Sequence, residues 1–187
     1  KENQIHFHKQ EINPLLIKYL NYIKKDKNRT SLNCLVPLCG KSLDMLWLQE
    51  NLGTVLGIEL SQLALDQFWE ENQITPRPKK LNSLNINQGN NITLICHDFL
   101  SISNHDISAI NGAIDIIYDR ASLIALPLEL RKKYYQKIMS IAPKNLTWLL
   151  ITLEYDNYEA QGPPFSIQQS ELKQYLSRDF SIELLDS

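Results

Sequence analysis

Apolar runs of strand length recur along the chain and alternate with longer amphipathic segments. These runs do not alternate between apolar and polar residues, a pattern typical of strands that are buried on both faces. The turn-rich sequences that bound them support strand assignments. The predicted strands are Ser31–Leu38, Thr54–Leu60, Ile92–Cys96, Ala113–Asp119, Leu146–Leu153 and Ser181–Leu185.

Apolar residues at helical spacing predict the helices between these strands. Asn13 with Pro14 is a typical helix start, and Ser61 can cap another helix. Pro127 and Pro143 bracket a helix whose inward residues should be Leu130, Tyr134, Ile138 and Ile141. Further helices are expected at Lys41–Asn51 and near Gln168–Ser177.

Buried strands alternating with helices predict an α/β fold, with a mostly parallel sheet and helices on both faces. The 187 residues suffice for one domain with a sizeable core. Residues 1–30 should form an N-terminal helix and a pocket lid. Residues 74–91 are rich in Pro, Lys and Asn, which predicts an irregular insertion.

A net charge of −2 gives no reason to expect nucleic acid or an anionic membrane as partner. The chain lacks the roughly 20 apolar residues that a membrane span needs, and its N-terminus does not resemble a signal peptide. We therefore expect a soluble, monomeric protein of the cytoplasm. The sequence does not begin with Met, which indicates a trimmed start.

The three cysteines, Cys34, Cys39 and Cys96, form no CxxC pair. They are expected to be reduced thiols. His6 and His8 lack carboxylate or cysteine partners at ligand spacing, so no metal site is predicted.

The segment from Val36 to Ser42 places Gly40 between a predicted strand and a helix, and three interpretations are open. It can be a plain connecting turn. It can be a phosphate-binding loop, although Leu35 stands where that motif needs glycine and Pro37 removes a backbone donor. It can also bind a nucleoside cofactor, because Glu59 follows Gly40 by about 20 residues, the spacing of a ribose-binding acid.

No G-x-G-x-x-G motif accompanies this turn, so a cofactor with a ribose but no pyrophosphate fits better. S-adenosylmethionine is the commonest such molecule. Asp98 and Phe99 follow the next predicted strand and suit the amino group and flat face of adenine, although Asp98 can also be a simple turn former. Asp119 and Arg120 end another strand, as a ligand-binding pair or a plain ion pair.

Taken together, these residues resemble the bacterial thiopurine S-methyltransferase family, and the similarity runs through nearly the whole chain. The resemblance is carried by Phe7-His8, Glu11–Leu15, Leu35–Leu48, Gly57–Ser61, Cys96, Asp98-Phe99, Tyr118–Ala121, Ile124–Pro127, Thr152–Asp156 and Gly162–Phe165. It implies a Rossmann-like class I methyltransferase fold that binds S-adenosylmethionine.

The resemblance also implies roles for single residues. The cofactor-binding residues would be Leu38, Gly40, Glu59, Asp98, Phe99 and Arg120, with Arg120 also the catalytic residue at the boundary with the substrate. Phe7, Pro163 and Phe165 are expected to line an aromatic, apolar substrate pocket.

Three departures from the family pattern stand out. His6 replaces a glycine, a cofactor-contacting tryptophan would fall just before Lys1, and the last antiparallel strand of the fold is missing after Ser181–Leu185. We therefore expect the sequence to be incomplete at both ends.

The resulting hypothesis is an enzyme that transfers a methyl group from S-adenosylmethionine to a small-molecule thiol, an aromatic heterocyclic thiol, or a selenium or tellurium compound. The alternatives are a P-loop-like nucleotide-binding protein and a non-catalytic module that binds S-adenosylmethionine.

Overall fold

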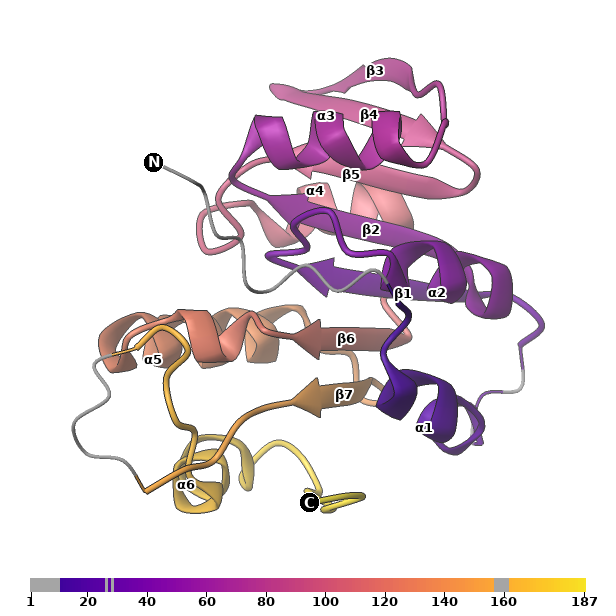
Figure 1. Cartoon of the computed structure of the whole chain (residues 1–187). Coiled ribbons are helices and arrows are strands. Elements are labelled where there is room, and N and C mark those ends of the chain that lie inside the picture. The colour runs from indigo at the N-terminus through magenta and orange to yellow at the C-terminus, as the bar shows by residue number, and fades with distance from the viewer. Residues whose placement is uncertain (1–10, 26, 28, 157–161) are drawn as a thin grey trace. The chain divides into compact units, whose positions relative to one another are not determined.

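The computed structural model describes residues 11–25, 27, 29–156 and 162–187 (Figure 1). Its helices and strands alternate along most of the chain. In order they are α1 (Pro14–Lys24), β1 (Leu32–Pro37), α2 (Asp44–Leu52), β2 (Gly53–Glu59), α3 (Gln62–Glu71), β3 (Arg77–Leu81), β4 (Leu84–Gly89), β5 (Ile92–Cys96), α4 (Asn104–Asn111), β6 (Ile116–Arg120), the 3₁₀ turn η1 (Leu123–Ala125), α5 (Leu128–Ile141), β7 (Thr147–Ile151) and α6 (Gln169–Leu176).

The strands form one seven-stranded sheet in the order β3-β4-β5-β2-β1-β6-β7. β1 pairs in parallel with β2 and β6, and β2 pairs in parallel with β5. β3 and β4 run antiparallel to their neighbours. The predicted α/β fold with a mostly parallel sheet is therefore confirmed.

The chain divides into two compact units. Unit 1 runs up to Tyr118 and includes Pro143–Leu149, and unit 2 comprises Asp119–Ala142 and Leu150–Ser187. The boundary falls within β6 and β7, so each of these strands begins in unit 1 and ends in unit 2.

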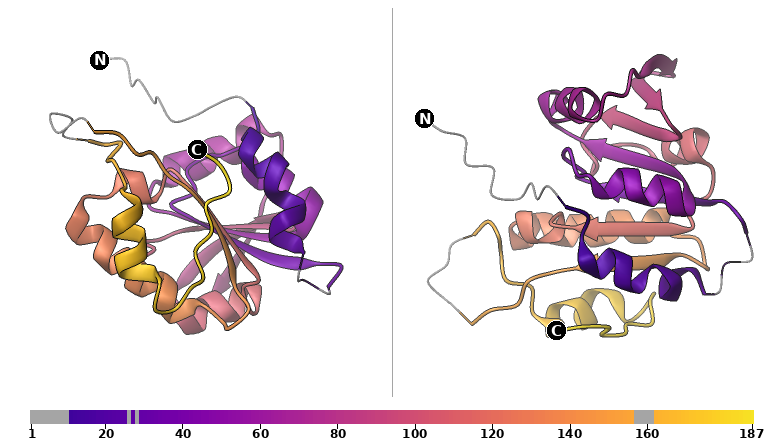
Figure 2. Two further views of the ribbon diagram at one scale, coloured as in Figure 1. Left: turned by 90° about the horizontal axis from the view of Figure 1, so that it is seen from below. Right: turned by 45° about the vertical axis from the view of Figure 1, so that its right-hand side comes forward.

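In unit 1, α2 and α3 lie on one side of the sheet and α4 lies on the other (Figures 1 and 2). The strands between them are buried on both faces, as their uninterrupted apolar sequences predict. Their most buried side chains, with no exposed surface, include Cys34, Leu35, Val55, Leu56, Ile58, Leu94 and Ile95.

Two predicted helix starts are confirmed by their hydrogen bonds. The Asn13 side chain accepts from the Leu15 backbone N–H at 2.9 Å, with Pro14 in the first turn of α1. The Ser61 hydroxyl accepts from the Ala64 backbone N–H at 3.2 Å and caps α3.

The prediction of an irregular insertion over residues 74–91 was wrong, because β3 and β4 form a hairpin there with a two-residue turn. Asn82 in that turn has a φ of 53°, a conformation that asparagine tolerates. Leu84 and Ile86 are buried while their neighbours face outward, so the strand alternation exists but is short. Pro78 is compatible with an edge strand, since one side of such a strand has no ladder partner.

The strand predicted at Ser181–Leu185 does not form, and the residues there have no regular secondary structure. Ile182 and Leu184 are exposed. Apolar alternation alone does not make a strand, because a strand also needs a neighbouring strand to pair with. In contrast, the short helix α4 was not predicted. Only Ile107 is buried in it, so it shows no apolar stripe.

α5 buries a face that overlaps only in part with the predicted one, and Ile141 is half-buried. Tyr134 and Ile138 are inside as expected, but Leu130 is exposed and Arg131 is buried in its place. An arginine is rarely assigned to a core from sequence, because it is seldom buried without a partner.

Among the described residues, the helices are all too short or too polar to cross a bilayer.

Candidate cofactor and acceptor sites

The carboxyl ends of β1, β2 and β5 are neighbours in the unit 1 sheet. Pro37 lies opposite Ile58, and Glu59 lies opposite Cys96. The His97 backbone N–H donates to the Glu59 carbonyl at 2.9 Å and continues this alignment past the strands. The sheet therefore brings the glycine turn, Glu59 and the segment of Asp98 to one edge, where open α/β sheets bind ligands.

The glycine turn has an unusual backbone. Leu38 has a φ of 46° and Gly40 a φ of 53°, both in the left-handed region. Glycine adopts this conformation freely, whereas for leucine it is strained. Strained residues of this kind gather at ligand sites, which favours a binding role for the turn over a plain connection.

The Glu59 carboxylate is bound to this turn. Its Oε2 accepts from the Gly40 backbone N–H at 2.9 Å, and its Oε1 accepts from the Ser61 backbone N–H at 2.9 Å. A carboxylate offers about four acceptor positions, so each oxygen keeps one for a ligand hydroxyl. Glu59 thus joins the two loops and still presents acceptors at the strand ends.

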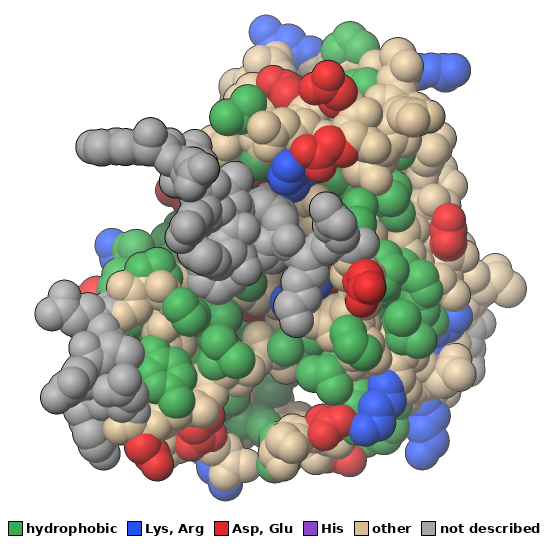
Figure 3. Space-filling view, viewed as in Figure 1, with side chains coloured by type: hydrophobic (Ala, Val, Ile, Leu, Met, Phe, Trp, Pro, Cys, Tyr) green, Lys and Arg blue, Asp and Glu red, His purple; other side chains and the backbone are tan. Residues whose placement is uncertain are grey.

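The charges around the turn oppose a phosphate loop. The Gly40 N–H already serves a carboxylate, and the Lys41 ammonium lies 2.5 Å from Glu71 Oε1 on α3. Acidic side chains gather over α3, with a basic side chain beside them (Figure 3). At the start of α2, Asp44 adds a buried carboxylate to the half-buried one of Glu59. Two acids beside the turn would repel a phosphate group.

Asp44 is a residue that the sequence analysis missed as a structural partner. Its Oδ2 accepts from the Tyr118 hydroxyl at 2.7 Å, and its Oδ1 accepts from the Asn13 backbone N–H at 2.8 Å. These bonds link α1, α2 and β6 within unit 1. The long separations of the partners along the chain left no local pattern to predict them.

The cysteines near the site differ in exposure. Cys34 and Cys39 are buried free thiols, and Cys96 is an exposed one. Burial raises the pKa of Cys39 well above its ordinary value, and the nearby Glu59 charge adds to this effect. Cys39 is therefore a neutral packing residue of the turn.

Asp98 and Phe99 occupy different environments. Asp98 is exposed, and its Oδ1 accepts from the Leu100 backbone N–H at 2.9 Å, which closes a turn after β5. The ring of Phe99 is only 3% exposed. Asp98 is accessible to a ligand, whereas the Phe99 ring belongs to the core of unit 1.

Leu60 is an exposed apolar residue that sequence reasoning did not single out. It directly follows Glu59, and 71% of its surface is accessible. A large apolar side chain left open beside a carboxylate offers an apolar contact for an aromatic base. The only hint in the sequence is its place at the end of a buried strand.

In unit 2, Asp119 is completely buried at the end of β6. Its Oδ2 accepts from the Tyr134 hydroxyl at 2.6 Å, while its Oδ1 has no hydrogen-bond partner among the described residues. Burial raises the Asp119 pKa to about 6, although the Tyr134 hydrogen bond opposes the rise. Arg120 follows it, half-buried, and leads into Ala121, whose φ is 68°.

Phe165 and Pro163 also belong to unit 2. The Phe165 N–H donates to the Ile124 carbonyl at 2.6 Å, and the Tyr155 hydroxyl donates to the Pro164 carbonyl at 2.6 Å. The loop is thereby held to η1 and to the segment after β7. Phe7, the third residue predicted for the substrate pocket, lies outside the described residues.

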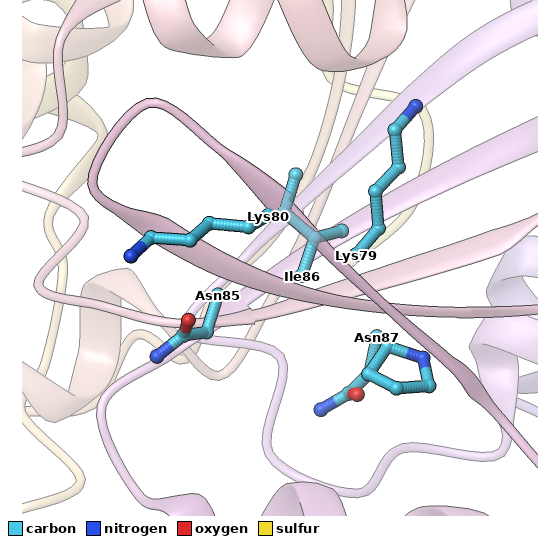
Figure 4. Close-up of a pocket in the computed structure, with 6 residues that line it drawn as sticks. Lys79, Lys80, Asn85, Ile86 and Asn87 are labelled. Atoms are coloured by element: carbon cyan, nitrogen blue, oxygen red, sulfur yellow. The ribbon is translucent and has the colours of Figure 1, made fainter.

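A shallow depression of about 330 Å³ lies on the β3–β4 hairpin, away from these strand ends (Figure 4). The ammonium groups of Lys79 and Lys80 point apart, so they do not converge on an anion. Charged side chains and Pro78 on this outer strand are typical of a protected sheet edge. Across the described ranges, no cluster of three or more potential metal-ligating side chains occurs.

A sequence model described as thiopurine S-methyltransferase matches residues 1–187. The chain belongs to the thiopurine S-methyltransferase family. It is 38% identical to the thiopurine S-methyltransferase of Shewanella frigidimarina, over 98% of this chain and 80% of that protein. It is also 38% identical to the one of Psychrobacter cryohalolentis, over 100% of this chain and 84% of that protein.

Solved structures support the fold of this family member. A SAM-dependent methyltransferase from Anabaena variabilis has a TM-score of 0.63 and 17% identity, over 88% of this chain and 69% of that chain. Magnesium protoporphyrin IX methyltransferase from Synechocystis, solved with bound SAH, has a TM-score of 0.62 and 13% identity, over 92% of this chain and 80% of that chain. The protein is therefore an S-adenosylmethionine-dependent methyltransferase that acts on small molecules, with S-adenosylmethionine as its cofactor.

Proposed function

We propose that the protein methylates the sulfur of a small-molecule thiol, including aromatic heterocyclic thiols, or the selenium or tellurium atom of a related compound, as a monomer. The observation that carries this proposal is the strand-end constellation of Glu59, the strained glycine turn and Asp98, within a chain of this family. The thiopurine named for its relatives is the model acceptor.

The residues at the strand ends of unit 1 fit S-adenosylmethionine. Glu59 would accept hydrogen bonds from the ribose hydroxyls with the acceptor positions that its two backbone contacts leave open. The exposed side chain of Leu60 would pack against the adenine, and Asp98 would accept from the adenine amino group. Leu38 and Gly40 would contact the rest of the molecule through the turn, and Phe99 would support the Asp98 turn from the core.

When bound, S-adenosylmethionine supplies an electrophilic methyl group: the acceptor sulfur bonds to the methyl carbon as the carbon–sulfonium bond breaks, which leaves S-adenosylhomocysteine, and the thiol proton goes to solvent. The task of the chain is to align the two reactants and exclude water. Orientation of this kind contributes roughly 7–11 kcal/mol to lowering a reaction barrier.

Arg120 is the proposed catalytic residue, because a guanidinium stabilises the negative charge of a thiolate or binds a carboxylate. Pro163 and Phe165 would form an apolar wall for the acceptor ring, held in place by the hydrogen bonds of their loop. Phe7 completes this wall in the proposal.

The proposal is tested first at the cofactor. Isothermal titration calorimetry should detect binding of S-adenosylhomocysteine to the full-length protein and none of Mg-ATP. Glu59→Ala should weaken the binding of S-adenosylhomocysteine by roughly 1.5–3 kcal/mol, the range for hydrogen bonds to a charged group. Glu50→Ala is the control, since Glu50 is an exposed acid on α2.

Unchanged affinity in Glu59→Ala would remove Glu59 from the ribose site. Binding of Mg-ATP alone would favour a phosphate loop. Binding of S-adenosylhomocysteine without methylation of 6-mercaptopurine or of a selenium or tellurium acceptor would favour a non-catalytic binding module.

A further inference from the structure

Arg131 is a buried arginine in unit 2, with 6% of its surface exposed. Its Nε lies 2.7 Å from Glu171 Oε1 and its Nη2 lies 2.9 Å from Glu171 Oε2. Its Nη1 donates to the Leu126 carbonyl at 2.9 Å. This two-pronged contact fixes the plane of the guanidinium as well as its charge.

Glu171 is itself held by two residues of α5, Arg131 and Tyr135. It belongs to α6, and its Oε1 also accepts from the Tyr135 hydroxyl of α5 at 2.9 Å. The Tyr135 ring stacks on Tyr175 of α6, with ring centres 5.1 Å apart. Burial and the Glu171 charge raise the pKa of Tyr135, which keeps its hydroxyl a donor. The ion pair is therefore anchored at each end.

The guanidinium carbon of Arg131 lies 5.9 Å from the centre of the Phe165 ring, within the range of a cation–π contact. The same ring packs against the backbone of Gly162. A side-chain carbon added at Gly162 would come within 2.4 Å of Phe165 Cδ1. Phe165 is thus held by Gly162, by Arg131 and by the bond from its N–H to Ile124.

A buried ion pair is a weak source of stability, because an apolar pair of similar size often serves as well or better. Its rigid geometry is better suited to orienting a neighbour, and the neighbour here is the aromatic residue proposed for the acceptor wall. The pair of Lys132 and Glu129 on the same helix, with its nitrogen and oxygen 2.7 Å apart, is exposed by comparison.

We propose that Arg131, held by Glu171, is a positioning residue that orients the Phe165 ring for an aromatic acceptor. This inference rests on the proposed function, in which Phe165 contacts the acceptor. It extends the acceptor site to a pair of residues that do not touch the acceptor themselves. It also makes aromatic thiols more dependent on this pair than aliphatic ones.

The test compares Glu171→Gln with the matched control Glu129→Gln. Steady-state kinetics with 6-mercaptopurine should show about a tenfold rise in KM for Glu171→Gln with kcat changed less than about twofold. The KM for 2-mercaptoethanol and the Kd for S-adenosylhomocysteine should stay within about twofold of the wild-type values. Glu129→Gln should match the wild type in all three measurements, because its carboxylate is exposed.

Phe165→Ala separates this inference from the function on which it rests. It should raise the 6-mercaptopurine KM by tenfold or more, and Glu171→Gln added to it should raise KM no further. If Phe165→Ala leaves KM unchanged, the acceptor wall itself is wrong.

If Phe165→Ala raises KM but Glu171→Gln does not, the wall stands and the positioning role fails, even where Glu171→Gln lowers the melting temperature. If the KM increases of Phe165→Ala and Glu171→Gln multiply in the double variant, the two residues act independently and the positioning role also fails. If Glu171→Gln raised the KM of both thiols equally, or weakened the binding of S-adenosylhomocysteine, the effect would not be confined to the aromatic acceptor. Arg131→Lys keeps the charge but loses the paired hydrogen bonds of the guanidinium to Glu171. It should give a KM between those of the wild type and Arg131→Met.

Discussion

Single residues at the strand ends depart from ordinary behaviour, each for a definable reason. Leu38 has a left-handed backbone, Glu59 is bound to two loop N–H groups, and Asp119 is a buried acid with one unpartnered oxygen among the described residues. The first two belong to the proposed cofactor site. Asp119 should make stability depend on pH, because burial raises its pKa.

The Asp119 pKa of about 6 lies above its value of about 3.9 in an unfolded chain. The folded state therefore binds this proton more tightly. The stabilisation that protonated Asp119 gives the folded state is complete below about pH 4. It is lost as the pH rises through about 6. Over that interval the wild type should lose about 2–3 kcal/mol more unfolding free energy than Asp119→Asn.

Urea denaturation of both proteins at pH 4 and pH 7.5 measures this difference. Asp66→Asn serves as the control, since Asp66 is an exposed acid on α3. Equal pH dependence of the wild type and Asp119→Asn would show that Asp119 does not carry the proton.

At the scale of elements, β2 is organised around a glycine. A side-chain carbon at Gly57 would come within 2.5 Å of Leu94 Cδ2, 2.8 Å of Cys39 Sγ and 3.0 Å of Met45 Sδ. Gly57 therefore lets β2 approach the turn, α2 and β5 at once. The glycine turn rests on this close approach, because Cys39 is part of it.

Gly57→Ala should lower the free energy of unfolding by about 1–3 kcal/mol, the usual effect of overpacking a core. It should also weaken S-adenosylhomocysteine binding, because the displaced Cys39 belongs to the turn. Asn85→Ala, an exposed change on β4, should do neither. Differential scanning calorimetry with and without ligand checks both effects, and a Gly57→Ala protein as stable as the wild type would refute the packing argument.

At the scale of the molecule, the proposed cofactor site is spread over three strand ends of unit 1 that are distant along the chain. A ligand seated on all three should protect all three from hydrogen exchange. S-adenosylhomocysteine is expected to slow exchange in peptides covering residues 36–42, 57–62 and 97–100.

Hydrogen-exchange mass spectrometry at a ligand concentration of about 100 times Kd provides the measurement, because binding then adds about 2.7 kcal/mol of stability. The hairpin peptide 77–89 is the internal control and should exchange at an unchanged rate. Protection of residues 36–42 alone would indicate a ligand bound only at the turn.

Much of this protein could be predicted from its sequence alone. The α/β class, most strands and the helix caps at Asn13 and Ser61 are local properties, because periodicity and capping act over a few residues. The pairing of Gly40 with Glu59 was also accessible, since parallel strands place their carboxyl ends at one edge. The family resemblance rested on motifs of the same local kind.

Only the tertiary structure decided which predicted or polar segments find partners. Residues 77–89 pair as the β3–β4 hairpin, whereas residues 181–185 have no strand to pair with. In α5, Arg131 is buried in unit 2 and Leu130 is exposed. The partner of Arg131 lies 40 residues away on another helix, and the Tyr118 partner of Asp44 lies 74 residues away. A buried charge is tolerated only where such a distant partner arrives, and no local pattern encodes that arrival.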